Sequence, residues 1–194
     1  MIDSKLVVKV AMRRYTYFGI LKTTFRDIAK VLDVLPGQVY QCYPLKDHLT
    51  TAVMEQLLKK YYRQVVNAVD PSKDFRENLF ILLKARCTFI KTHYRIYLTL
   101  ESSMEQENYH RLEEVYSLVR NQILDHPKCY LLVNRTEDVV TPAALSELIV
   151  VLDEELFSCF RVFQRKLLLN QRQLNSIFDQ QYKICEDFLS KMNQ

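Results

Sequence analysis

Glycine and proline are scarce in this chain, which holds 2 Gly and 5 Pro in 194 residues. Because β-sandwiches and barrels need many Gly- and Pro-rich turns, the composition disfavours these all-β classes. Two glycines are also too few for the Gly-rich loop with which many nucleotide-binding proteins surround phosphates. A hydrophobic content of 48% is enough for a substantial core. The composition therefore favours an α-rich globular protein with short connections.

Long apolar runs and paired cysteines are also missing. Runs such as Leu79–Leu83 and Leu148–Leu152 are typical of the longest, and both are far too short to cross a membrane. Lys9, Arg13 and Arg14 interrupt the apolar start, so no signal peptide is expected. The five cysteines form no Cys-x-x-Cys pair. We therefore expect a cytoplasmic protein with free thiols and no membrane association.

Catalytic and metal-binding patterns are not evident either. The four histidines form no close pair, and no Ser/His/Asp or Cys/His arrangement stands out. Glu107, His110 and Glu114 would share a helix face, but a solvated charged face explains them better than a metal site. The sequence thus predicts a protein that is not an enzyme and has neither a metal nor another cofactor.

A helical period of apolar residues recurs almost throughout the chain. Residues 127–141 lack this period, and their conformation stays open. The expected helices are, in chain order, 4–18, 24–32, 36–43, 46–69, 73–93, 94–104, 106–125, 142–167 and 172–192.

Local signals mark the first helices. Asp3 or Ser4 can cap the first helix, whose inward side would hold Val7, Val10, Ala11 and Phe18. Gly19 stands where a C-terminal cap belongs. Thr23 or Thr24 can cap the second helix, and Pro36 suits the first position of the third.

Positive charge is concentrated at the N-terminal end. Residues 1–63 hold eleven Lys and Arg against five Asp and Glu, whereas the remainder is slightly acidic. A basic third on a mildly acidic remainder indicates a polyanionic partner at one end of the protein.

The segment Thr24–Leu49 reads TFRDIAKVLDVLPGQVYQCYPLKDHL. It combines a short helix, a tight turn, a second short helix and a lysine that opens a longer helix. This order is typical of a helix-turn-helix, in which the second helix enters the major groove of DNA.

The same segment resembles the DNA-binding domain of TetR-family transcriptional regulators. The matching residues are Thr24, Asp27, Ile28, Ala29, Val34, Gly37, Val39, Tyr40, Tyr43, Lys46, Asp47 and Leu49. The resemblance implies an all-α protein with a three-helix DNA-binding domain at 1–45. Residues 46–194 would form a larger helical domain for ligand binding and dimerisation, with 46–69 as the connecting helix.

Six residues are candidates for DNA contacts: Thr24, Gln38, Tyr40, Gln41, Tyr43 and Lys46. Gln38 and Gln41 would lie on the outer face of the third helix, where an amide can bind adenine with two hydrogen bonds. The remaining four would contact phosphates, although Tyr40 and Tyr43 could instead be core aromatics. Three departures from the family pattern, Leu35, Pro36 and Leu45, remove polar caps and could weaken DNA binding.

Two further sites are expected in the helical remainder. Aromatic, Met and Cys side chains with few polar groups predict a pocket for a largely apolar or aromatic effector, lined by some of Phe80, Cys87, Phe89, His93, Tyr97, Met104, Tyr109 and Tyr116. The resemblance also implies a homodimer through a four-helix bundle of the last two helices, with an interface of Leu148, Leu152, Leu156, Phe160, Phe163, Ile177, Tyr182 and Phe188.

The sequence therefore predicts a homodimeric regulator, in particular a repressor, that binds a palindromic double-stranded operator and is released by a small-molecule effector. The alternative is a helical interaction protein of the same fold that has lost operator binding. The second hypothesis depends on Leu35, Pro36 and Leu45.

Overall fold

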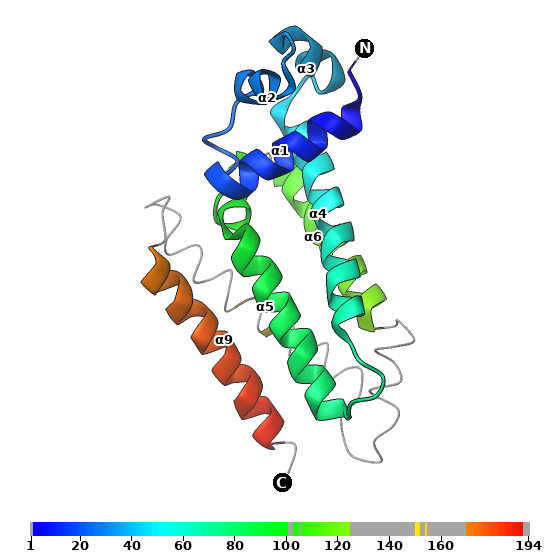
Figure 1. Ribbon diagram of the computed structural model, residues 1–194, viewed down its shortest axis with the longest axis vertical. Helices are drawn as coiled ribbons and strands as arrows, with labels where there is room; N and C mark the ends of the chain where they lie inside the picture. Colours follow the sequence, from blue (N-terminus) through cyan, green and yellow to red (C-terminus); the bar gives the residue numbers. More distant parts are fainter. Residues whose placement is uncertain are drawn as a thin grey trace. The chain divides into compact units, whose positions relative to one another are not determined.

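The computed structural model describes residues 2–100, 103–104, 106–124, 150–151, 154 and 170–191. Within these ranges the regular structure is helical and contains no strand (Figure 1), which confirms the all-α class. The helices are α1 (Ser4–Phe18), α2 (Phe25–Leu32), α3 (Pro36–Cys42), α4 (Lys46–Ala68), α5 (Phe75–Leu100), α6 (Gln106–Leu124) and α9 (Gln171–Lys191). The expected helix at 142–167 and the open segment at 127–141 lie almost entirely outside the described residues.

The chain divides into two compact units. The first comprises Met1–Lys60 with His93–Tyr116, and the second comprises Tyr61–Thr92 with Ser117–Gln194. Helices α4, α5 and α6 each contribute residues to both units. The boundary expected after residue 45, between a DNA-binding domain and a ligand-binding and dimerisation domain, stays a prediction.

Helix α1 begins at the expected cap, because the Asp3 carboxylate accepts a hydrogen bond of 2.9 Å from the Lys5 amide. Its inward side includes Val7, Ala11 and Tyr15, each fully buried. The expected core position of Phe18 is wrong, since 49% of this residue is exposed. Tyr15, one turn earlier, takes the core position, and the Phe18 ring lies under the Arg14 guanidinium at 4.2 Å.

Gly19 ends α1 as expected, with φ at 81° and its amide donating to the Tyr15 carbonyl. A Cβ at Gly19 would lie 3.5 Å from the Arg95 carbonyl oxygen, so the chain approaches the last part of α5 closely here. The next amide, that of Ile20, donates to Thr99 Oγ1 at 3.3 Å. The end of α1 is therefore docked on α5 within the first unit.

Helix α5 replaces the two helices expected at 73–93 and 94–104. Its residues run from Phe75 to Leu100 as one element. It is nevertheless kinked at His93, whose φ of −109° and ψ of 15° are not helical. Two helical segments therefore meet at a kink at the position where the break was expected, and that position is confirmed.

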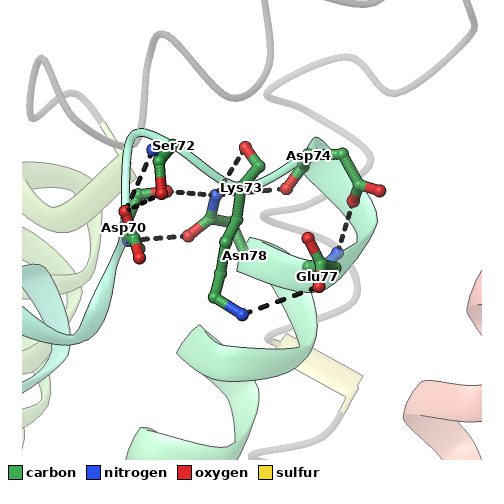
Figure 2. A network of polar contacts seen from close by, with 6 residues as sticks. All are labelled: Asp70, Ser72, Lys73, Asp74, Glu77 and Asn78. Atoms are coloured by element: carbon green, nitrogen blue, oxygen red, sulfur yellow. Dashed lines mark hydrogen bonds and ion pairs between the residues drawn. The ribbon is translucent and has the colours of Figure 1, made fainter.

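The connection between α4 and α5, in the second unit, is built around Asn78 (Figure 2). This residue is fully buried, and its Nδ2 donates to the backbone carbonyls of Asp70, Lys73 and Asp74. Its Oδ1 accepts a hydrogen bond of 2.8 Å from the Asp70 amide. One amide side chain therefore satisfies several backbone groups of the turn, which fixes the start of α5.

Helix α9 also belongs to the second unit and buries Leu174, Ile177 and Phe178. Lys91 Nζ on α5 donates to Asn175 Oδ1 on α9 at 2.8 Å. None of the described helices is both long and apolar enough to span a membrane.

Candidate DNA-binding surface

The turn between α2 and α3 depends on Asp33. Its φ of 54° and ψ of 49° are left-handed, a conformation that Asp tolerates better than most residues. The Val34 amide donates to the Ala29 carbonyl at 3.1 Å and closes the end of α2. Asp33 thus preserves the tight turn between α2 and α3.

Helix α2 is capped by Thr24 and Asp27 together. The Asp27 amide donates to Thr24 Oγ1, and Asp27 Oδ2 accepts from both the Thr24 amide and the Thr24 hydroxyl. These hydrogen bonds, with Arg14 at 3.7 Å, hold the pKa of the Asp27 carboxyl below its usual value. The single hydroxyl proton of Thr24 is thus already donated within the chain, so a phosphate contact would need this cap to rearrange.

Helix α3 is anchored by Val39, which is fully buried. The Tyr40 ring meets the Phe25 ring edge-on at a centroid distance of 4.6 Å, yet 51% of Tyr40 stays exposed. Gln41 is exposed, and a Cβ at Gly37 would meet no atom within 4 Å. Helix α3 therefore keeps an open outer face, as a helix that enters a DNA groove requires.

Gln38 has a structural role that the sequence analysis missed. No side chain at Leu35 caps α3, and instead Gln38 Oε1 accepts a hydrogen bond of 3.3 Å from the Leu35 amide. Glutamine at the third helical position is a known capping signal, so the sequence could have indicated this bond. Gln38 remains half-buried, whereas Gln41 is exposed.

Tyr43 and Lys46 lie at the end of α3 and the start of α4, and both are half-buried. Burial raises the pKa of Tyr43, although a hydrogen bond to the Ser4 side chain opposes this shift. Burial also lowers the pKa of Lys46, and the nearby Asp27 carboxylate opposes that change. Tyr43 thus packs partly as a structural aromatic, and Lys46 lies beside an acidic group.

The departures from the family pattern create exposed apolar side chains. Leu35 is 75% exposed and Leu45 is 56% exposed. Neither contributes to the core, so these two leucines are surface features of the helix-turn-helix.

The residues expected to line an effector pocket fall in both units. Phe80, Cys87 and Phe89 belong to the second unit, where the Phe89 ring packs against Tyr61 at 5.2 Å. The other five belong to the first unit: His93, Tyr97, Met104, Tyr109 and Tyr116. Cys87, Phe89, His93 and Tyr97 are buried, and the remainder are half-buried.

Most residues expected at a dimer interface, namely Leu148, Leu152, Leu156, Phe160 and Phe163, lie outside the described residues. Of those on α9, Ile177 is 6% exposed in the single chain, and Tyr182 is half-buried. The side chain of Phe188 is not among those described.

Helix α6 lines an open depression of about 600 Å³, formed by Gln106, Glu107, Asn108, His110, Arg111 and Glu114. His110 Nδ1 pairs with Glu113 Oε2 at 3.0 Å. In the described part of the chain, no group of three His, Cys, Asp or Glu residues could hold a metal ion.

One known protein is similar to this chain in sequence over most of its length. No protein-family profile matches the chain. An uncharacterised HTH-type transcriptional regulator of Bacillus subtilis (strain 168), YhgD, is 29% identical over 143 residues, which cover 73% of this chain and 71% of that protein.

Two solved structures share the fold at low sequence identity. A transcriptional regulator from Cytophaga hutchinsonii is 15% identical, with a TM-score of 0.68 and coverage of 96% of each chain. The TetR-family repressor FadR of Thermus thermophilus, solved with lauroyl-CoA, is 16% identical, with a TM-score of 0.58 and coverage of 94% of this chain and 93% of its own. This chain therefore combines a helix-turn-helix with further helices in the residues that the structure describes. More specifically, the chain has the fold of TetR-family transcriptional regulators, so the resemblance seen in the N-terminal motif is confirmed at the level of the fold.

Proposed function

We propose that this chain regulates transcription by binding a palindromic double-stranded DNA operator as a homodimer, in the cytoplasm. The observation that carries the proposal is the α2–Asp33–α3 arrangement, whose outer α3 face is open beside an inner face anchored by Val39. The similarity to an HTH-type regulator over 143 residues supports the same conclusion. A dimer with twofold symmetry would place one α3 in the major groove of each half-site.

The contacts at the DNA would be divided among different side chains. Gln41 is exposed and would read a base edge, whereas Lys46 and the Tyr40 hydroxyl would contact phosphates. Gln38 would add its amide N–H groups while its oxygen holds the Leu35 amide. Because an adenine contact uses both amide atoms, this arrangement gives Gln41 the larger role in base recognition.

Dimerisation would use the segment 142–167, which the sequence predicts to be a helix, together with α9, as in four-helix bundles. Ile177 is already covered by its own chain, so we assign it to the edge of this interface rather than its centre. Light scattering at micromolar concentration tests the proposal: a mass of twice 23.1 kDa is expected, and a clean monomer mass contradicts it.

The regulator would be a repressor that a largely apolar effector releases. Cys87 and Phe89 supply buried apolar and aromatic surface in the second unit, and the similar FadR structure contains lauroyl-CoA. An effector that favours a dimer geometry with mismatched α3 spacing would weaken operator binding. Compounds that raise the melting temperature should therefore change DNA affinity; stabilisation without such a change argues against release by an effector.

The exposed Leu35 and Leu45 favour one alternative, a helical interaction protein that keeps the fold without binding an operator. Selection of duplexes from a random DNA pool distinguishes the two functions. A DNA-binding regulator should enrich an inverted repeat, whereas an interaction protein should leave the pool unchanged. The enriched repeat would also give the operator sequence.

A further inference from the structure

The outer side of α1 carries a row of cations that the proposed contacts do not use. Lys5, Lys9 and Arg13 are all exposed and follow one another at intervals of four residues. Residues four apart lie on the same side of an α-helix. At 1.5 Å per residue, this α1 cation row is about 12 Å long.

The positive charge of the α1 cation row is not neutralised by an acidic residue of the same helix. Helix α1 contains no acidic residue, and in the described part of the chain none of the three cations forms an ion pair. Asp3 caps the helix, and Asp27 holds Thr24 and Arg14. Like charges four residues apart destabilise a helix, so the row is best accounted for by a polyanionic partner.

The opposite side of α1 shows what kind of polyanion fits. A helix that binds a lipid surface must bury a free apolar face in the bilayer. In α1 most of that face is already occupied, because Val7 and Ala11 are fully buried in the core and Val10 is 8% exposed. The large apolar side chains of α1 that stay exposed are Leu6, Tyr17 and Phe18. The α1 cation row therefore fits a rigid polyanion that it can contact with charge alone, and a DNA duplex is such a partner.

Helix α1 is also joined directly to the helix-turn-helix. Arg14 pairs with Asp27 of α2, and the Cys42 thiol at the end of α3 donates to the Ile2 carbonyl at 3.7 Å. Contacts at both ends of α1 hold the row in a defined position relative to α2 and α3. A duplex bound by α3 would thus meet cations whose placement is fixed before binding.

We propose that the α1 cation row binds phosphates of the same duplex that α3 reads. This inference rests on the proposed function, and it assigns to α1 a sequence-independent share of the affinity. Because each phosphate contact releases counterions, that share should fall steeply as salt rises.

The test compares the full-length chain with the triple variant Lys5→Gln, Lys9→Gln, Arg13→Gln. Glutamine retains helix propensity, and circular dichroism checks that the variant folds. The dependence of log K on log[salt] should become shallower by about one unit per contacting cation, up to about three per bound chain. The change should be the same on selected and random duplexes, and phosphate ethylation interference should weaken at the same backbone positions.

A matched control removes the same charge elsewhere. Lys84, Arg172 and Lys183 are exposed residues of the second unit, and changing all three to Gln should leave the slope unchanged. An equal loss in both variants would mean that net charge alone acts, which overturns the assignment to α1.

The remaining outcomes are also decisive. If the unaltered chain binds a selected duplex and the α1 variant gives the same slope, the α1 proposal fails while the proposed function stands. If the unaltered chain binds no duplex, both fail. Vesicles with about 30% anionic lipid probe the membrane alternative. If the α1 substitutions leave the salt slope of DNA binding unchanged but abolish binding to these vesicles, the partner is a membrane surface and the DNA assignment is wrong.

Discussion

Thr16 on α1 and His93 on α5 are 77 positions apart in the chain and are joined by a hydrogen bond of 3.0 Å between Oγ1 and Nδ1. The Thr16 hydroxyl donates its only proton to the Met12 carbonyl at 2.9 Å. The His93 Nδ1–H is therefore the donor in the bond to Thr16, which fixes the neutral tautomer of the ring. The bond lies at the kink of α5, where it orients the imidazole and joins α1 to α5.

Removing the acceptor should expose the value of this bond. Thr16→Val leaves the buried His93 Nδ1–H without its acceptor, which should lower the free energy of unfolding by about 1–3 kcal/mol in urea titrations. Thr88→Val is the control, because the exposed Thr88 hydroxyl donates to the Lys84 carbonyl of its own helix. Equal losses in the two variants would contradict a specific role for the Thr16–His93 pair.

Acidification should destabilise the protein through His93. Burial lowers the pKa of His93 to about 4 from the ordinary 6.5, and the positive charge of Lys60 adds to this shift. Between these two values the unfolded chain binds more protons than the folded chain, so stability falls as the pH drops from about 6.5 to about 4.

The contribution of His93 to this loss should be at most about 3.5 kcal/mol, because each pKa unit corresponds to about 1.4 kcal/mol. His93→Gln keeps an amide donor but does not titrate. Urea titrations at several pH values should therefore show a shallower loss of stability in this variant. Identical pH dependence in the two proteins would mean that His93 is not held neutral by the fold.

Asp33 allows a test of the helix-turn-helix turn. Because its φ is 54°, Asp33→Gly should relieve strain and leave stability unchanged or raised by up to about 1 kcal/mol. Asp33→Ala should instead be destabilising, since Ala lacks the polar side chain that eases left-handed geometry. In α9 the exposed Asp179 is helical, so Asp179→Gly should cost up to about 1 kcal/mol. Thermal unfolding of the three variants checks these opposite signs.

Asn78 should not tolerate the smallest chemical change. Asn78→Asp replaces the donor that faces three backbone carbonyls with an acceptor, so we expect a loss of more than about 3 kcal/mol. Asn175→Asp is the matched control, because Asn175 Oδ1 already accepts from Lys91 and the new carboxylate keeps that contact. Chemical denaturation should separate the variants, and similar stabilities would contradict the buried role of Asn78.

Local sequence signals predicted much of the fold. Asp3, Gly19, Thr24 and Asp33 each terminate or begin a helix through hydrogen bonds to near neighbours, so their roles could be recognised from short motifs. Phe18 was misplaced because periodicity does not show where the last residue of a helix leaves the core.

Features that depend on distant residues could not be predicted in the same way. The kink at His93 was located from the sequence, but the hydrogen bond that joins His93 to Thr16, 77 positions away, could not be predicted. At the candidate site, the sequence motif located α3. The hydrogen bond from Leu35 to Gln38 follows a capping pattern that the sequence also contains. The exposure of Tyr40 beside Phe25 required the packed structure.

The most direct test of the central claim compares Gln41→Ala with Lys46→Ala on a duplex selected by the unaltered chain, with affinities measured over a range of salt concentrations. Gln41→Ala should cost about 1–3 kcal/mol on this duplex and relax the preference at one base pair, with the salt slope nearly unchanged. Lys46→Ala should weaken binding to every sequence and reduce the salt slope by about one unit. If both variants bind the selected duplex as tightly and as selectively as the unaltered chain, α3 is not the DNA-reading helix and the account is contradicted.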